Sequence, residues 1–552
     1  MIHHVEVQVL VLLLIASMVG MAARRLRLPY TLALVVAGLV LGFVRLDALE
    51  GLELNKDLLL LLFLPALLFE AALHIDVKEV KRDLVPILTM AVPGVAVAVL
   101  ATAGLLFAGL GLTGLASDFG WPQAFLMASV IAATDPISVL ALFKQLGVPR
   151  RLYLLVEGES LLNDGVAVVV FVIIAAVLGV SSGHGEAHAL HGVSEIARYG
   201  VRTFVWMAGG GVLIGLIIGG ATSALTRQID DHLIEVTLTT LVAYGSFLLA
   251  EQVHASGVLS TVCAGVVMGS FGRHWGMSVS TRIAVEDFWE YAAFLANSFI
   301  FLLVGLELDP AVLWGSAGAI VVAFVAVAAG RAIAVYGGLP LATRWSAKIP
   351  TKWRHVMWWG GLKGSLSMVL IITLPSDFPG RSVLVTLVFG VVALSLFVQG
   401  LSMPGLMRVL GMLHTSDERR EYERGRVAAL TAQGALGALD GLAKHGYIEP
   451  DAHQRLRDWY VAQETEGRSR AAQHVGDSAL DEQIIETWQR VLDAERDSLR
   501  HALHSGLVSP EVAGDATREL DHRQHLLDEA AHGNEEARRE ALSKLVVETK
   551  AD

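Results

Sequence analysis

The sequence predicts an all-α polytopic membrane protein with thirteen transmembrane helices, followed by a helical cytoplasmic tail. The chain has 552 residues, of which 54% are hydrophobic and 17% are charged, and its mean hydropathy is +0.56. Soluble globular domains carry about 25% charged residues. Of the 96 charged residues, 46 lie in residues 415–552, and these account for −10 of the formal net charge of −12. The first 414 residues are therefore apolar enough to form a membrane domain.

The composition also excludes several classes of protein. A soluble enzyme is excluded by the hydropathy, and 42 Lys and Arg residues together with an acidic tail argue against a nucleic-acid partner. Cys263 is the sole cysteine, so no disulfide can form within the chain. The first apolar segment precedes the basic cluster Arg24, Arg25 and Arg27, whereas a signal peptide has the opposite order. We therefore expect this segment to be the first transmembrane helix.

Thirteen segments are long and apolar enough to cross a hydrocarbon core of ~30 Å, which requires about 20 residues of helix. Their approximate bounds are 5–23, 28–46, 56–74, 84–110, 122–144, 152–180, 198–226, 233–252, 255–272, 286–308, 310–337, 352–374 and 380–403. If the N-terminus is outside, the inner connections contain sixteen Lys and Arg residues and the outer ones five. The positive-inside rule therefore predicts a multi-pass protein of the cell membrane with a cytoplasmic C-terminus.

These bounds divide the chain into a membrane domain, residues 1–410, and a cytoplasmic tail, residues 415–552. In the tail, Gly446-Tyr-Ile-Glu-Pro450 and Gly506-Leu-Val-Ser-Pro510 both have the pattern of a helix stop followed by a proline at the next helix start. They predict two similar helical hairpins, with a packing or dimerisation role. The outer loop 181–195 contains His184, His188 and His191. We interpret it as a solvated loop rather than a metal site.

Ionisable side chains inside the predicted spans indicate a functional site. A charge near the bilayer centre costs ~2.5 to 3.5 kcal/mol, so such residues face a cavity or a partner. Five acids and two bases lie within five of the spans: Glu70 in the third, Asp135 in the fifth, Glu157, Glu159 and Asp164 in the sixth, Arg331 in the eleventh and Lys363 in the twelfth. Three midplane acids without a common function are improbable, so the group as a whole predicts an ion pathway.

Two of these spans are expected to be interrupted. Pro136 disfavours helical geometry at Asp135 and cannot donate a hydrogen bond, and three glycines surround Lys363 within Gly360–Gly364. If spans 1–6 and 8–13 form two inverted repeats, each of the two interrupted spans is the fifth span of its repeat. Interrupted helices at matching positions are typical of transporters with a midplane site. The half-helix dipoles would then be offset by Asp135 near a positive end and Lys363 near a negative end.

The sixth span supplies a donor set for a small cation. Residues four apart share a helical face, so Glu159 lies over Asn163 and Ser160 lies over Asp164. Carboxylate, hydroxyl and backbone oxygens are good ligands for hard cations. The sixth span therefore predicts a cation site next to the opened backbone at Thr134.

Five motifs in order resemble those of the monovalent cation/proton antiporters, in the sodium/proton exchanger branch with the bacterial NhaP-type proteins. They are Phe63-Leu-Pro-Ala-Leu-Leu-Phe-Glu70, Ala133-Thr-Asp-Pro136, Glu157-Gly-Glu-Ser-Leu-Leu-Asn-Asp-Gly165, Phe301-Leu-Leu-Val-Gly-Leu-Glu307 and Trp359-Gly-Gly-Leu-Lys-Gly364. The resemblance covers roughly residues 5–410. It implies a thirteen-helix fold with a core domain and a dimerisation domain, two crossed discontinuous helices, and a homodimer.

The resemblance also assigns roles to individual residues. Asp164 resembles the essential carboxylate that binds either ion, and Asn163 the neutral partner beside it. The remaining cation or proton ligands by resemblance are Thr134, Asp135, Ser160 and Glu70, with Na⁺ held by Asp164, Asp135, Thr134 and Ser160. Glu159 and Arg331 resemble a structural ion pair. Lys363, the charge of the second broken helix, departs from the family pattern, in which many members have Arg, and Lys is a more compact and more strongly hydrated charge.

These expectations define a secondary active antiporter, not an enzyme, that exchanges Na⁺, and also Li⁺, for H⁺ without a cofactor. The neutral Asn163 favours one cation per proton. Roles in pH homeostasis and salt tolerance follow from that activity, and the tail's regulatory partner is unknown. A K⁺/H⁺ antiporter on the same site remains the main alternative, because oxygen ligands alone do not fix the cavity size. A cation channel is less favoured, since channels build filters from symmetric rings or carbonyls. No span has the His-Glu-x-x-His motif of a metalloenzyme.

Overall fold

The computed structural model describes residues 2–26, 29–44, 58–75, 77–81, 83–116, 119–135, 139–140, 142–143, 148–180, 192–226, 231–272, 277, 279–307, 309–342, 349–412, 417–444, 448–473 and, with gaps, 484–544. All regular secondary structure in these residues is helical. The chain divides into two compact units, Met1–Leu413 and His414–Asp552. Pro136 and the histidines His184, His188 and His191 lie outside the described residues, so the predictions made for them stay predictions.

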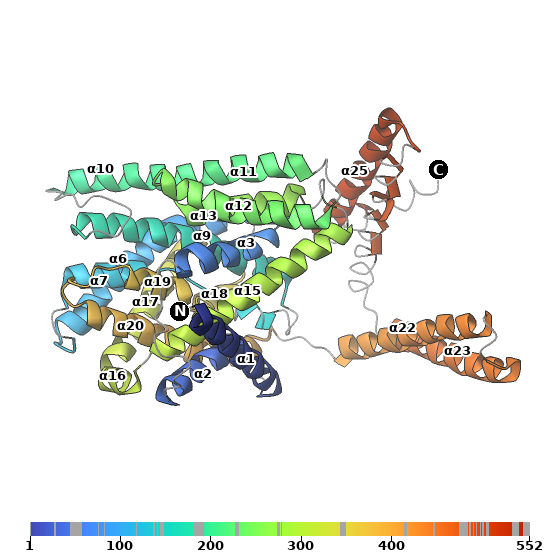
Figure 1. Ribbon diagram of the computed structural model, residues 1–552, viewed down its shortest axis with the longest axis horizontal. Helices are drawn as coiled ribbons and strands as arrows, with labels where there is room; N and C mark the ends of the chain where they lie inside the picture. Colours follow the sequence, from blue (N-terminus) through green and yellow to red (C-terminus); the bar gives the residue numbers. More distant parts are fainter. Residues whose placement is uncertain are drawn as a thin grey trace. The chain divides into compact units, whose positions relative to one another are not determined.

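The first unit, Met1–Leu413, is called the membrane unit here, and it is built from long helices (Figure 1). In the described part of the chain, seven helices are long and apolar enough to cross a membrane: Leu84–Gly111, Arg150–Val177, Ser194–Thr226, His232–Gln252, Thr281–Glu307, Ala317–Ala342 and Arg381–Val409. Four shorter apolar helices, of 10–17 residues, coincide with other predicted spans: Gln8–Ala23, Tyr30–Phe43, Leu60–Leu73 and Gly257–Phe271. A polytopic helical membrane protein is therefore confirmed.

Two further predicted spans are interrupted helices. Helix α7 (Trp121–Val130) ends three residues before Ala133, and residues 133–135 are not helical. Helix α18 (Thr351–Trp359) stops at Gly360, and α19 (Ser365–Ile372) starts after an extended Gly364. Glycine loses more conformational freedom in a helix than other residues, so three glycines within five residues favour the second interruption. Each interruption leaves backbone groups outside a regular helix within a predicted span, which a membrane tolerates where those groups line a cavity or are buried in protein.

Helix α9 (Arg150–Val177) is the central element of the membrane unit. Nineteen of its 28 residues are buried, and it contacts α3 (Leu64–Leu73), α7 and α13 (Gly257–Val267). Helix α17 (Ala317–Ala342) packs against α6 (Val95–Leu106) and α18. Because most of α9 is buried, the charged side chains at positions 157, 159 and 164 must face internal partners or a cavity.

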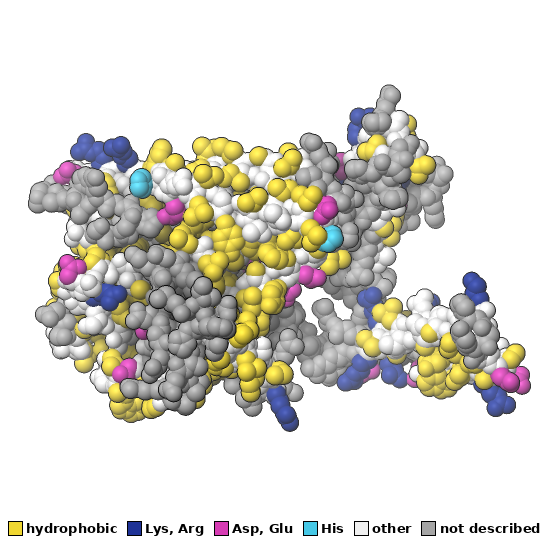
Figure 2. Space-filling view, viewed as in Figure 1, with side chains coloured by type: hydrophobic (Ala, Val, Ile, Leu, Met, Phe, Trp, Pro, Cys, Tyr) yellow, Lys and Arg dark blue, Asp and Glu magenta, His cyan; other side chains and the backbone are white. Residues whose placement is uncertain are grey.

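Close backbone contacts hold the surrounding helices together. A Cβ atom on Gly38 of α2 (Tyr30–Val44) would lie 2.8 Å from the Cα of Gly305 of α15 (Val279–Glu307), and the reverse distance is the same. Small residues at such crossings let membrane helices pack without side chains between them. Figure 2 shows groups of apolar side chains on the visible face of the membrane unit. Leu213 and Ile217 of α11 (Gly210–Thr226) are among the exposed apolar residues of this unit.

The C-terminal unit contains helical pairs. Helices α22 (Asp417–Lys444) and α23 (Pro450–Gln473) cross at Gly425 and Gly467, where a Cβ on either glycine would lie within 2.8 Å of the other backbone. Helix α25 (Pro510–His532) packs Leu520 and Leu527 against Leu492 from the preceding helical stretch. Pro450 and Pro510 are the first residues of α23 and α25, as their pattern predicts. The glycines of that pattern, at 446 and 506, lie outside the described residues.

Candidate ion-binding site

The two interrupted helices lie against each other at their breaks. The backbone N–H of Asp135 donates to the carbonyl of Leu362 at 2.9 Å. The ammonium of Lys363 donates to the carbonyls of Ala133 at 3.3 Å and Ala132 at 3.5 Å. These carbonyls follow the C-terminal end of α7, where a helix carries partial negative charge. Lys363 is therefore placed where its charge offsets the dipole of the opposite half-helix.

Asp135 has the complementary position at the start of α19. A Cβ atom on Gly364, which precedes α19, would lie 2.7 Å from Oδ2 of Asp135. Only glycine leaves room for the carboxylate so close to this backbone. The N-terminal end of a helix carries partial positive charge and unpaired N–H groups. Lys363 thus lies at the negative end of α7 and Asp135 lies at the positive end of α19, as the sequence predicts.

A network of hydrogen bonds holds the opened backbone at Thr134 against α9. The N–H of Thr134 donates to Oδ1 of Asp164 at 3.3 Å, and the Thr134 hydroxyl lies 3.0 Å from the hydroxyl of Ser160. Ser160 also donates to the Thr134 carbonyl. Asn163 donates through Nδ2 to the Thr134 hydroxyl and to the Ala132 carbonyl, both at 3.0 Å. Three side chains of α9 therefore fix the conformation of one short segment.

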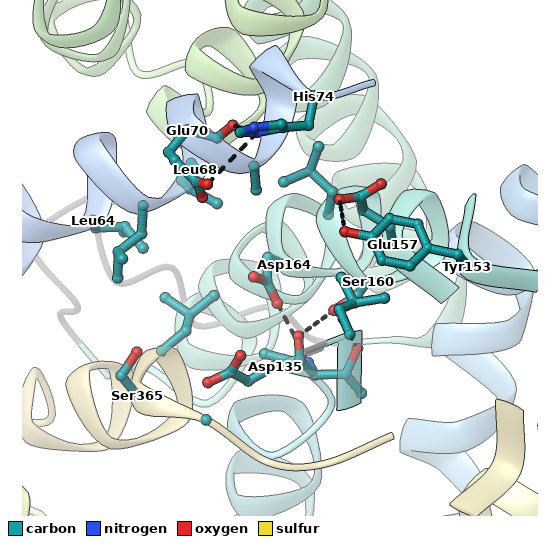
Figure 3. A pocket seen from close by; sticks show the side chains of 18 residues that line it. Leu64, Leu68, Glu70, His74, Asp135, Tyr153, Glu157, Ser160, Asp164 and Ser365 are labelled. Carbon is teal, nitrogen blue, oxygen red and sulfur yellow. Dashed lines mark hydrogen bonds and ion pairs between the residues drawn. The ribbon is translucent and has the colours of Figure 1, made fainter. Parts of the chain in front are cut away.

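A cavity of about 240 Å³ opens next to this network (Figure 3). One wall is α3, with Glu70 and His74. Helix α9 supplies a second wall, and the break segments supply Thr134, Asp135, Gly364 and Ser365. The α9 side chains that line the cavity are Tyr153, Glu157, Ser160, Leu161 and Asp164. Carboxylate, hydroxyl and backbone oxygens thus converge on one space, a donor set suited to a hard cation.

The buried ion pair lies on the other side of α9. Nη2 of Arg331, on α17, donates to Oε2 of Glu159 at 2.9 Å, and Nη1 donates to Oε1 at 3.1 Å. Nη2 also donates to the Met357 carbonyl of α18 at 2.9 Å. Glu159 is 2% exposed and Arg331 is 12% exposed. One guanidinium therefore joins three helices around the interrupted segment.

The structure separates the predicted site residues into two groups. Five of them line the cavity together: Glu70, Thr134, Asp135, Ser160 and Asp164. The other four line a smaller hollow of about 20 Å³ on the opposite side of the break: Glu159, Asn163, Arg331 and Lys363. Asn163 connects the groups through its bond to Thr134. In the described residues, no three His, Cys, Asp or Glu side chains are placed to hold a metal ion together.

Three polar residues of the cavity were not predicted from the sequence: His74, Tyr153 and Ser365. A fourth, Glu157, was noted in the sequence but was given no role. His74 follows Glu70 by four residues, and its Nδ1 lies 2.9 Å from the Glu70 carbonyl. Tyr153 donates its hydroxyl to Oε1 of Glu157 at 3.3 Å. Ser365 is the first residue of α19. Positions 153, 157, 160 and 164 share one helical face, so that spacing could have identified Tyr153 and assigned Glu157 to the cavity wall.

The chain is similar to known sodium/proton antiporters over most of its length. A family model described as sodium/hydrogen exchanger, transmembrane, matches residues 10–409. The chain is 38% identical to the Na⁺/H⁺ antiporter NhaG of Bacillus atrophaeus over 466 residues. This alignment covers 83% of this chain and 85% of that protein. It is 39% identical to the Na⁺/H⁺ antiporter NhaH of Halobacillus dabanensis over 420 residues. That alignment covers 74% of this chain and 99% of the relative.

The fold also matches a solved structure, the sodium proton antiporter MjNhaP1 from Methanocaldococcus jannaschii at pH 8. The TM-score is 0.58 at 17% sequence identity, and the match covers 74% of this chain and 99% of that chain. Apolar helices whose two interrupted members meet beside carboxylates in predicted spans have the architecture of a secondary transporter. The protein belongs to the sodium/hydrogen exchanger family.

Proposed function

We propose that the protein is an antiporter that exchanges Na⁺ for H⁺ across the cell membrane, by competition of the two ions for Asp164. The observation that carries the proposal is the position of Asp164 in the 240 Å³ cavity beside Asp135 and Thr134. The antiporter names of NhaG and NhaH support the same activity. An ionised carboxylate is costly inside a membrane unless it faces a cavity or partner. Asp164 therefore crosses the membrane only with a bound proton or cation.

In the cation-loaded state, Na⁺ is held by the carboxylates of Asp164 and Asp135 and the hydroxyls of Thr134 and Ser160. Glu70, on the opposite wall, contributes directly or through water. In the proton-loaded state, Asp164 is neutral and the cation is absent. In the acid range, where protons occupy Asp164, mass action lowers the apparent cation affinity about tenfold per pH unit. Competition for one carboxylate is the coupling between the two fluxes.

The exchange ratio follows from Asn163. Its amide donates to Thr134 and Ala132, and a neutral amide carries no second exchangeable proton. We infer one cation per proton, hence electroneutral exchange, with Li⁺ as a second substrate. Glu159 and Arg331 act as a structural ion pair, and Lys363 holds the broken helix through its carbonyl contacts.

The finer architecture belongs to the same proposal. Thirteen spans form two inverted repeats, and spans 5 and 12 are the crossed discontinuous helices. Residues 1–410 contain both the core helices and the dimerisation helices. The N-terminus is outside, the C-terminus is cytoplasmic, and the protein is a homodimer. The core moves against the dimerisation helices, so that the cavity opens alternately to the two sides.

The decisive experiment uses purified protein in proteoliposomes that contain a pH-sensitive dye. We expect an outward-directed proton gradient to dissipate on addition of Na⁺ or Li⁺, without generating a membrane potential. A response to K⁺ equal to or greater than that to Na⁺ would replace the proposal with K⁺/H⁺ exchange. A cation flux that moves no protons would identify a channel instead.

Asp135→Asn is expected to reduce the exchange severely without unfolding the protein. The amide fills the same space beside Gly364 but removes one of the two carboxylate charges next to the cation. We expect the KM for Na⁺ to rise at least tenfold, measured by the same dye assay. Asp287→Asn is the matched control, because Asp287 is exposed on α15 and does not line the cavity. Wild-type KM in Asp135→Asn would remove Asp135 from the site.

We propose that residues 415–552 form a cytoplasmic domain that regulates transport. The NhaH relative aligns over 99% of its own length with only 74% of this chain, and the match to the sodium/hydrogen exchanger family model ends at residue 409. We therefore expect a chain ending at residue 415 to retain exchange in proteoliposomes, with an altered pH or Na⁺ dependence. Identical dependences in the full and shortened chains would refute a regulatory role.

A further inference from the structure

The small hollow on the far side of the break from the ion cavity has a polar lining. Its volume is about 20 Å³, and its polar side chains are Thr102, Glu159, Asn163, Arg331 and Lys363. Glu159, Asn163 and Lys363 are 2%, 1% and 4% exposed. A hollow of about 10 to 15 Å³ holds one water molecule where two to four polar groups can bond to it. The hollow is therefore large enough and polar enough for a single water.

The amide of Asn163 has an acceptor that needs a donor from this hollow. Nδ2 donates to the Ala132 carbonyl and to the Thr134 hydroxyl, both at 3.0 Å. Oδ1 is buried, and it accepts no hydrogen bond from the residues that the structure describes. Turning the amide over would place Oδ1 beside the Ala132 carbonyl, where two acceptors repel. An unpaired buried acceptor is costly, so a donor in the hollow would stabilise this side chain.

Lys363 carries an N–H donor close to that amide. Its ammonium donates to the carbonyls of Ala133 at 3.3 Å and Ala132 at 3.5 Å. The ammonium and the amide of Asn163 lie next to each other, because both donate to the Ala132 carbonyl. An ammonium has three N–H groups, and two of them reach acceptors in the described part of the chain. The third is left for a molecule in the hollow.

The charges around the hollow favour a neutral occupant with both a donor and an acceptor. Arg331 and Lys363 are positively charged and disfavour a bound cation. The carboxylate of Glu159 and Oδ1 of Asn163 disfavour an anion in the same space. A water molecule accepts a hydrogen bond from an N–H group and donates one to an oxygen atom, so it matches both kinds of group.

We propose that this hollow binds one water molecule, which accepts from the Lys363 ammonium and donates to Oδ1 of Asn163. The water holds the amide with Nδ2 toward Thr134, and so it sets the direction of the hydrogen bonds in the ion site. The Thr134 hydroxyl accepts from Nδ2 and lies 3.0 Å from the Ser160 hydroxyl, which donates its proton to the Thr134 carbonyl. The Thr134 hydroxyl must therefore donate to Ser160. Both hydroxyl protons are engaged within the network, and each hydroxyl oxygen keeps one lone pair for a cation.

The water site is tested by a structure of the purified wild-type protein, in a map that shows buried waters elsewhere in the membrane unit. We expect one density peak within about 2.7 to 3.2 Å of both Oδ1 of Asn163 and Nζ of Lys363. Absence of this peak from such a map would overturn the proposal, as would bromide density at this position in a sample prepared with bromide. The effect of the water on cation binding rests on the proposed Na⁺/H⁺ exchange, but the peak does not. Absence of Na⁺-dependent proton movement in wild type would instead overturn the proposed function.

Lys363→Arg and Lys363→Met test the bridge between Lys363 and Asn163. Arginine keeps the charge and is longer than lysine, so its guanidinium can replace the water and donate to Oδ1 directly. Methionine has no donor and leaves Oδ1 unpaired. We expect both variants to lose the water peak, with a guanidinium nitrogen in its place in Lys363→Arg. The KM for Na⁺ in the dye assay should be about fivefold or more higher in Lys363→Met than in Lys363→Arg.

Lys352→Met is the matched control, because Lys352 is exposed on α18 and does not line the hollow. It should keep the water peak and the wild-type KM. A water peak that persists in Lys363→Arg would show that the ammonium does not hold the water, and equal KM values for the Arg and Met variants would show that the bridge does not act on the ion site. Either result would overturn the proposal.

Discussion

Asp164→Asn is expected to abolish Na⁺-dependent proton transport and leave the folded protein intact. The substitution preserves the shape of the side chain, and the amide oxygen can still accept the 3.3 Å hydrogen bond from the Thr134 N–H. What it removes is the group that binds a proton or a cation in alternation. Without that charge, the cavity has no carboxylate in contact with the Thr134 backbone. The dye response to Na⁺ should fall to that of protein-free liposomes.

Folding and transport must be measured on the same preparation. The elution volume and the thermal midpoint in detergent should match those of wild type, because the variant keeps the packing of α9. Asp287→Asn again serves as control, since it removes a carboxylate that is exposed on α15. Substantial exchange by folded Asp164→Asn would end the proposal that one carboxylate couples the two ions.

The scarcity of charge made much of this site predictable. Glu70, Asp135 and Asp164 interrupt otherwise apolar segments, and an ionisable residue in such a segment must face a cavity or partner. The structure places all three on the wall of one cavity. Helical periodicity also separated two faces of α9: Ser160 and Asp164 line the cavity, whereas Glu159 and Asn163 line the hollow behind it.

Tertiary proximity was the part that periodicity could not supply. Glu159 and Arg331 are 172 residues apart, and their pairing was expected only from the family resemblance. The contact of Lys363 with the Ala133 carbonyl depends on how closely the two breaks approach, which Gly364 permits by lacking a Cβ atom. His74 was not predicted as a cavity residue, because a histidine at the end of an apolar helix gives no signal by itself. Its place on the cavity wall depends on the side chains of α9 across the cavity, which the local sequence does not show.

The tail illustrates a different limit. Its Gly and Pro pattern predicted the starts of α23 and α25, because proline is tolerated in the first turn of a helix. Nothing in that local pattern specifies that Gly425 and Gly467 meet where α22 crosses α23. Such a contact is decided by the packing of two helices, so it is visible only in the folded unit.

Arg331→Ala is expected to destabilise the membrane unit by about 3 to 5 kcal/mol, because it leaves the buried Glu159 carboxylate without its guanidinium partner. The same change removes the donor to the Met357 carbonyl that ties α17 to α18. Thermal unfolding in detergent should show a lower midpoint and less recoverable protein. Arg202→Ala, at an exposed position of α10 (Val193–Phe204), should change the midpoint little.

A second substitution distinguishes loss of charge balance from loss of packing. Glu159→Gln in the Arg331→Ala background replaces the unpaired carboxylate with a neutral amide of similar size. If the uncompensated charge dominates, the double variant should be more stable than Arg331→Ala alone, because residues in direct contact do not act additively. If it is equally unstable, the bond from Arg331 to Met357 and the side-chain volume carry the effect, and the ion pair contributes little to holding α9, α17 and α18 around the break.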